Sequence, residues 1–184
     1  MLFVSAIQSE LGDLPGEPLG VGPVVAAIRM ATLLERLHPT AVCFVGTAGA
    51  YEIVPEVGSA VASRRIGLSP SVAVMGMGYV PRPPRPVESD RLLLERLDLP
   101  RVDVLTVNAI TTDPVLMSRL SDGWQVEHME AYGVGLACHK AEIPFVAVLG
   151  IANRVGPEAH TEWLQNQARA QDAARKAARL LSAG

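Results

Sequence analysis

The sequence lacks any apolar run long enough to cross a membrane. Hydrophobic residues make up 49% of its 184 positions, yet no window approaches the roughly 18 consecutive apolar residues of a membrane span. The amino-terminal segment MLFVSAIQSELGD has an apolar stretch of only about five residues and no basic region before it, which favours a first β-strand over a signal peptide. We therefore expect a cytoplasmic protein that does not contact a membrane.

Cysteine is scarce. The two cysteines, Cys43 and Cys138, lie in apolar runs and have no partner at CxxC spacing, which predicts reduced, buried thiols and argues against a disulfide or a zinc site. The histidines also show no spacing that would place two on one metal ion; they are His38, His128, His139 and His160. We expect no metal and no cofactor, and we assign no histidine a catalytic role.

Positive charge is not in excess, because 16 Lys and Arg stand against 19 Asp and Glu, for a formal net charge of -3. The basic residues are scattered or concentrated near the carboxyl end, so that no face resembles the basic surface that nucleic acids require. A GxGxxG motif is also missing after the first apolar run, which argues against a Rossmann dehydrogenase. Nucleic-acid binding and dinucleotide chemistry are both disfavoured.

The sequence does contain short apolar runs that alternate with helical patterns. Buried strands are predicted over residues 2–7, 41–45, 102–110 and 145–152. Helices are predicted over residues 24–37, 129–142 and 161–181, and a short helix is predicted after Asp113. This alternation indicates an α/β fold, a three-layer sandwich around a central mixed β-sheet, in a single domain spanning residues 1–184.

The segments between these elements are rich in glycine and proline. Residues 12–22 read as a loop, and residues 80–86 as an exposed, stiff loop. Two short strands are expected between residues 58 and 77, broken at residues 67–70.

Polar residues follow several of the predicted strands. They are Gln8–Glu10, the GTAG segment Gly46–Gly49, Asn108 with Thr111 and Thr112, and Asn153–Arg154. Because ligands bind beyond the carboxyl ends of parallel strands, we expect these residues to line one cleft. A further segment, Glu127–Glu130, precedes an apolar helix and is expected to open it.

Two of these segments allow a structural as well as a functional interpretation. The GTAG segment is predicted to be a turn of small residues, which either lets a ligand approach the backbone or merely packs a strand against a helix. Glu130 falls in the first turn of a helix, where the dipole favours a carboxylate. Helix capping explains Glu130 equally well, although Glu127 fits that role better.

Taken in order, the segments AIQSEL, CFVGTAGAY, TVNAITTD and VEHMEAYGVGLACHKAEIPFVAVLGIAN resemble those of nucleoside phosphorylases and nucleosidases. The resemblance runs from about residue 2 to residue 153. It is closest to futalosine hydrolases and to methylthioadenosine/S-adenosylhomocysteine nucleosidases. The pair Met129-Glu130 at the start of a helix is its most specific part, and the upstream GTAG segment reinforces it.

The resemblance implies a nucleoside as the small-molecule partner. It assigns Glu130 to hydrogen bonding with a ribose hydroxyl, and Met129 to packing against the sugar. A carboxylate there would stabilise the positive charge that grows on the sugar as the N-glycosidic bond breaks. By the same resemblance, Thr47, Ala48 and Gly49 contribute to substrate binding.

The resemblance also bears on whether water or phosphate attacks the sugar. Bacterial phosphorylases of this group carry an arginine where this chain has Phe44, and the AIQSEL segment is similar to the AMEEEV-like segment of the nucleosidases. By that match Glu10 is the base that orients or deprotonates water. Hydrolysis is therefore expected over phosphorolysis.

The leaving base is suggested by departures from the adenine-specific nucleosidases, whose last strand carries an arginine and an aspartate where this chain has Leu149 and Asn153. An asparagine amide donates and accepts at once, which matches a 6-oxopurine. Futalosine hydrolases, which release hypoxanthine from a menaquinone precursor, resemble this pattern and also have a tryptophan farther on, as at Trp163. Arg154 is a candidate to replace the arginine missing at Leu149.

Other interpretations stay open: a methylthioadenosine/S-adenosylhomocysteine nucleosidase, a nucleoside phosphorylase, or a relative that binds nucleosides without turning them over. The chain is shorter than typical family members, and residues 12–22 lack a segment that would cover the sugar. We therefore expect a homodimer or larger homo-oligomer in which a neighbouring subunit closes the site.

Overall fold

The computed structural model describes residues 1–52 and 54–182. Its strands are β1 (Leu2–Ser5), β2 (Gly16–Pro18), β3 (Val42–Ala50), β4 (Ala60–Leu68), β5 (Val87–Glu88), β6 (Arg101–Thr106), β7 (Val126–His128) and β8 (Phe145–Arg154). Its helices are α1 (Gln8–Leu11), α2 (Pro23–Leu37), α3 (Ser71–Val74), α4 (Arg91–Glu95), α5 (Pro114–Leu120), α6 (Ala131–Lys140) and α7 (Ala159–Ala178), followed by the short 3-10 helix η1 (Arg179–Leu181).

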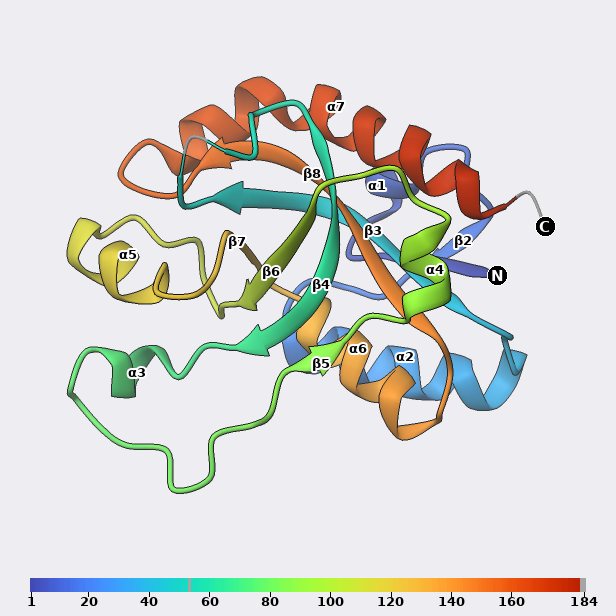
Figure 1. Cartoon of the computed structure of the whole chain (residues 1–184), viewed down its shortest axis with the longest axis horizontal. Coiled ribbons are helices and arrows are strands. Elements are labelled where there is room, and N and C mark those ends of the chain that lie inside the picture. The colour runs from blue at the N-terminus through green and yellow to red at the C-terminus, as the bar shows by residue number, and fades with distance from the viewer. Residues whose placement is uncertain (53, 183–184) are drawn as a thin grey trace.

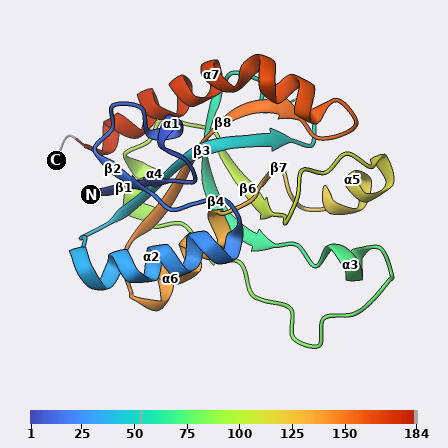
Figure 2. The same ribbon diagram turned by 180° about the vertical axis from the view of Figure 1, so that it is seen from behind.

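All eight strands belong to one mixed sheet with helices on two sides. Helix α7 runs along one side, and α2 and α6 lie together on the opposite side (Figure 1). Figure 2 shows the same arrangement from behind. The predicted α/β fold with a central mixed sheet is therefore confirmed.

The sheet closes on itself, so it differs from the open central sheet of the predicted three-layer sandwich. Its strand order is β2-β1-β3-β7-β6-β4-β5, and β8 pairs with both β3 and β4. Strand β8 is parallel to β3 and antiparallel to β4. Strands β3, β7, β6, β4 and β8 thus form a closed, barrel-like ring.

The central strands are buried on both faces, as their continuous apolar runs predict. Along β3, Val42 and Phe44 belong to the hydrophobic cluster that includes α2 and α6, whereas Cys43 and Val45 belong to the cluster that includes α7. This alternation follows from the two-residue period of a strand. Strand β8 is divided between the two clusters in the same way.

Several local predictions are confirmed. The predicted helix over residues 24–37 is α2, and its chain direction changes at His38, which has a left-handed φ of 43°. Asp113 caps α5, because its side chain accepts a hydrogen bond from the Leu116 amide at 2.7 Å. Residues 80–86 are exposed and form neither helix nor strand. Both cysteines are buried and free.

Other local predictions are wrong. The two short strands expected between residues 58 and 77 are one continuous strand, β4, followed by the helix α3. A bulge between Ser63 and Arg65 lets β4 pair with β6 along its length. The loop expected over residues 12–22 contains β2.

Across the described residues, no helix is long and apolar enough to span a membrane.

Candidate active site

A pocket of about 180 Å³ lies where the ends of β3 and β8 meet the segments that follow β1 and β7. It brings together four of the five polar segments singled out in the sequence. Its polar lining residues are Glu10, Thr47, Glu127, His128, Glu130, Asn153 and Trp163, and its other lining residues include Ala48, Gly49 and Met129. From the segment after β6, Val107 and Ile110 line the pocket, whereas Asn108, Thr111 and Thr112 are not among its lining residues.

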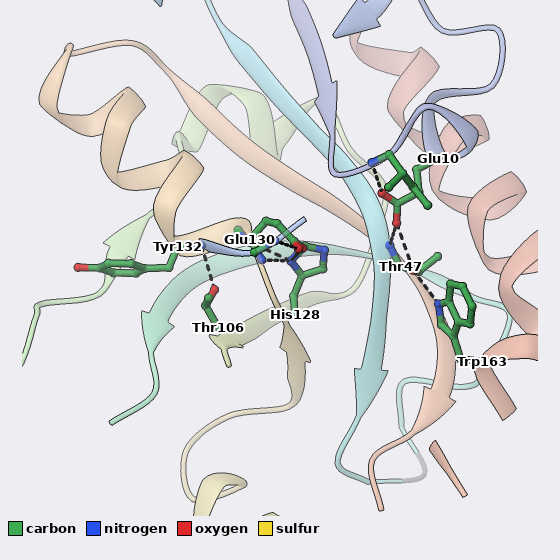
Figure 3. Close-up of polar contacts among 10 residues, drawn as sticks. Glu10, Thr47, Thr106, His128, Glu130, Tyr132 and Trp163 are labelled. Carbon is green, nitrogen blue, oxygen red and sulfur yellow. Dashed lines mark hydrogen bonds and ion pairs between the residues drawn. The ribbon is translucent and has the colours of Figure 1, made fainter. Parts of the chain in front are cut away.

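Glu10 lies in the short helix α1 that follows β1, rather than directly at the end of the strand as expected. Its carboxylate is almost entirely buried. One oxygen, Oε1, accepts hydrogen bonds from the Thr47 amide at 3.0 Å and the Thr47 hydroxyl at 3.2 Å (Figure 3). The other, Oε2, accepts from the Ile7 amide at 3.4 Å, which closes the first turn of α1. These contacts fix the carboxylate at the pocket wall.

The environment of Glu10 makes it suited to exchange protons near neutrality. Burial, followed by the nearby charge of Glu130, raises the pKa of Glu10 to about 7, although the donors of Ile7 and Thr47 act in the opposite direction. A general base works best when its pKa lies near the working pH. Glu10 therefore meets the electrostatic requirement for a base.

The GTAG segment forms the end of β3 rather than the predicted turn. Its glycines leave room for side chains that cross the strand. A Cβ at Gly46 would lie 2.9 Å from Nε2 of His128, and one at Gly49 would lie 2.9 Å from Nδ2 of Asn153. Between them, Thr47 binds Glu10 and also accepts a hydrogen bond from the Trp163 indole at 3.3 Å. Strand β3 thus holds one wall of the pocket.

Glu127 does not cap a helix, contrary to the prediction. It lies in β7, where its carboxylate accepts hydrogen bonds from the Tyr51 hydroxyl and the Thr111 amide, each at 3.0 Å. Burial raises the pKa of Glu127. This short strand was not predicted, because its three residues carry no apolar alternation and pairing with β3 and β6 holds it in place.

Glu130 occupies the backbone N-cap position of α6, one residue before the first turn in which it was expected, yet its side chain makes no capping hydrogen bond. Its Oε1 instead accepts a hydrogen bond at 2.8 Å from the Gly22 amide, in the loop before α2. The side chain is only 5% exposed and lines the pocket beside Met129. The helix-capping explanation of this buried carboxylate is therefore wrong.

The end of β8 delivers Asn153 to the pocket but turns Arg154 elsewhere. The Asn153 amide nitrogen donates to the Arg154 carbonyl at 2.8 Å. The Arg154 guanidinium donates to the carbonyls of Glu52 and Pro55, and Arg154 is not among the lining residues. Leu149 is fully buried in the hydrophobic core. The Arg154 side chain therefore does not line the pocket in place of the arginine that is missing at Leu149.

One pocket residue, His128, received no role in the sequence interpretation. It directly precedes the Met129-Glu130 pair, and this adjacency was the only available signal. Its Nδ1 accepts hydrogen bonds from the amides of Glu130 and Ala131 at 3.0 and 3.2 Å. Its ring lies edge-on to Phe44, with 5.0 Å between ring centroids.

Comparison with known proteins gives similarities in both sequence and structure. The chain is 29% identical over 163 residues to a 5'-methylthioadenosine/S-adenosylhomocysteine nucleosidase of Bacillus subtilis (strain 168), covering 79% of this chain and 70% of the relative. The enzyme of the same name from Bacillus thuringiensis (strain Al Hakam) is 26% identical, over 88% of this chain and 79% of the relative.

Solved structures share the fold at lower identity. The 5'-methylthioadenosine/S-adenosylhomocysteine nucleosidase of Neisseria meningitidis, in complex with methylthio-immucillin-A, superposes with a TM-score of 0.83 at 18% identity, covering 100% of this chain and 98% of that one. Futalosine hydrolase of Helicobacter pylori strain 26695 superposes with a TM-score of 0.80 at 14% identity, covering 98% and 94%. The sequence profile of the Phosphorylase superfamily matches residues 14–183. The chain therefore belongs to the Phosphorylase superfamily.

Proposed function

We propose that the protein is a nucleosidase that hydrolyses the N-glycosidic bond of a purine nucleoside. The observation that carries this proposal is the pair of buried carboxylates, Glu10 and Glu130, on one pocket. The pKa of Glu10 lies near 7, so that this residue alternates between base and acid at neutral pH. Relatives in sequence and in fold that are named as nucleosidases support the same reaction.

The reaction follows from the placement of the two carboxylates. As the bond between the base and the sugar carbon breaks, its electron pair leaves with the base, and positive charge develops on the sugar. Glu130 accepts a hydrogen bond from a ribose hydroxyl and stabilises that charge. The oxygen of a water molecule bonds to the sugar carbon and gives one proton to Glu10. Glu10 then releases this proton to the solvent, and the departing base takes up one proton from the solvent, so that the products are free sugar and free base.

Asn153 supports a 6-oxopurine as the leaving base, with futalosine as the leading substrate. An asparagine amide cannot protonate a base, but it offers an acceptor oxygen and a donor nitrogen. One Nδ2 hydrogen is engaged with the Arg154 carbonyl, which leaves the acceptor and the second hydrogen for the purine edge. The alternative substrates, methylthioadenosine and S-adenosylhomocysteine, are favoured by the names of the relatives.

A direct assay tests the function and separates these substrates. The purified protein is incubated with futalosine, inosine or methylthioadenosine, each with and without phosphate, and the products are separated by chromatography. We expect hypoxanthine and free sugar from futalosine without phosphate. A sugar phosphate that forms only with phosphate would instead identify a phosphorylase. No release of base from any of them, despite binding, would indicate a relative that binds nucleosides without turnover.

We further propose that the protein forms a homodimer through the start of α2. Four apolar residues in the first turns of this helix and just before it are 53 to 68% exposed: Val21, Val24, Val25 and Ile28. Val21 also lines the pocket, and the neighbouring Gly22 amide binds Glu130. A second copy seated on these side chains would bury them and close the sugar side of the pocket.

Charge at this surface should therefore weaken both assembly and substrate binding. We expect the double variant Val24→Lys with Ile28→Lys to elute as a monomer in size-exclusion chromatography with light scattering, and to have a higher KM than the dimeric wild type. Leu92→Lys, at a 70% exposed position of α4, is the matched control and should remain dimeric. A wild-type monomer, or a double variant that stays dimeric, would contradict this assembly.

A further inference from the structure

His128 ends β7 with its side chain 3% exposed, and the hydrogen bonds of its ring define which nitrogen carries the proton. Nδ1 accepts from the backbone amides of Glu130 and Ala131. An imidazole nitrogen that accepts hydrogen bonds is unprotonated, so the proton of the neutral ring lies on Nε2. The Oε2 atom of Glu130 lies 3.5 Å from Nδ1, but without a proton on Nδ1 this contact is no ion pair.

The surroundings keep His128 neutral. Burial lowers its pKa, and the charge of Glu130 opposes that shift only in part. Edge-on contact with Phe44 holds the ring plane. The side chain is therefore a fixed, uncharged hydrogen-bond donor with one orientation.

That donor points into the pocket without a protein partner. Among the described residues, Nε2 makes no hydrogen bond, and every fully enclosed side-chain nitrogen or oxygen of these residues has a partner, so that Nε2 is open to the pocket that the ring lines. A Cβ placed at Gly46 would lie 2.9 Å from Nε2 and 3.5 Å from Oε1 of Glu10, so the donor and the carboxylate flank the same glycine. In the view of Figure 3, His128 and Glu130 lie on one side of β3, and Glu10 and Thr47 lie on its other side. A small ligand between them can contact both.

We propose that His128 is a catalytic residue whose Nε2–H donates a hydrogen bond to the oxygen of the attacking water. The inference rests on the proposed hydrolytic function. One lone pair of the water accepts from His128, one of its protons faces Glu10, and its second lone pair forms the bond to the sugar carbon. Glu10 takes the proton, whereas His128 neither gains nor loses one. This arrangement supplies a donor to the water in a pocket from which Arg154 is turned away.

Two substitutions separate this role from the structural role of the ring. In His128→Asn, the amide oxygen can still accept from the start of α6, but no donor reaches the water. We expect kcat to fall roughly 100-fold, the size of effect that misplacing a reacting group produces, while KM changes little. In His128→Gln, the longer side chain places an amide donor near the position of Nε2, and part of the lost kcat should return. His139→Asn, at an exposed position of α6, is the matched control and should behave as wild type.

Urea unfolding of each variant checks that the fold is retained, and imidazole nitrogen chemical shifts in the wild type report the tautomer independently of activity. A proton on Nδ1 of His128, or wild-type kcat in a folded His128→Asn, would overturn the inference while base release by the wild type still upholds the nucleosidase. Failure of the wild type to release any base would reject the proposed function, and the role of His128 would fall with it.

Discussion

Replacing Glu130 by glutamine is expected to remove nearly all turnover while the protein still folds and binds the free base. The glutamine oxygen can keep the hydrogen bond from the Gly22 amide, because the two side chains have the same shape. A neutral amide, however, cannot stabilise the positive charge that develops on the sugar. Removing one such electrostatic contact typically lowers kcat by about 10²- to 10³-fold, and we expect the upper end because Glu130 is buried.

The measurements are kcat for base release and the affinity for hypoxanthine by calorimetry. Glu95→Gln is the matched control, since this carboxylate lies on α4 and pairs with Arg91 away from the pocket. The control should retain wild-type kcat. If Glu130→Gln released base at the wild-type rate, the carboxylate would have no part in the chemistry.

Replacing Glu10 by glutamine is expected to lower kcat by roughly 10³-fold, within the range attributed to general acid–base catalysis. In the wild type the rate should fall as the pH drops below about 7, because the carboxyl group takes up the proton that it must leave free for the water. A pH profile of kcat over pH 5 to 9 measures this effect. A profile that stays flat through neutrality, or a fully active Glu10→Gln variant, would exclude Glu10 as the base.

The same substitution, Glu10→Gln, should raise the stability of the fold at neutral pH although it lowers kcat. The folded pKa of Glu10, about 7, lies above its ordinary value of 4.5. The stabilising contribution of the protonated Glu10 carboxyl group is therefore fully present below pH 4.5 and is lost as the pH rises through about 7. Relative to wild type, Glu10→Gln should gain stability between pH 5 and pH 8, by about 1 to 3 kcal/mol. Urea unfolding at both pH values measures the change, and an identical difference at the two would contradict it.

The sequence was sufficient for the buried strands and the longer helices, because their patterns repeat over many residues. Strand β3 carries a continuous apolar run, and α2 has clear signals at both ends. The short elements were missed for a physical reason. Strand β7 forms because it pairs with β3 and β6, and β2 forms because it pairs with β1. A strand of only three residues has too short a sequence pattern to be predicted when its pairing partners are distant in the sequence.

The site was predictable in its members but only partly in its geometry. The order of the motifs indicated Glu10, Thr47, Glu130 and Asn153, and all four line one pocket. The direction of Arg154 depended on carbonyl groups about one hundred residues away in the sequence. An isolated histidine carries no spacing signal. Only the folded structure places Nε2 of His128 beside Gly46, where it can serve as a hydrogen-bond donor in the pocket.

The closed ring of the sheet also limits how the protein can aggregate. Strands with a free edge can pair with the edge of another molecule, and in the described sheet the terminal strands are β2 and β5. These have only three and two residues, and each contains or follows a proline, Pro18 and Pro86. Proline cannot donate to a neighbouring strand. The long apolar strands that carry the pocket are thereby shielded from edge-to-edge association, even though they are the segments most prone to it.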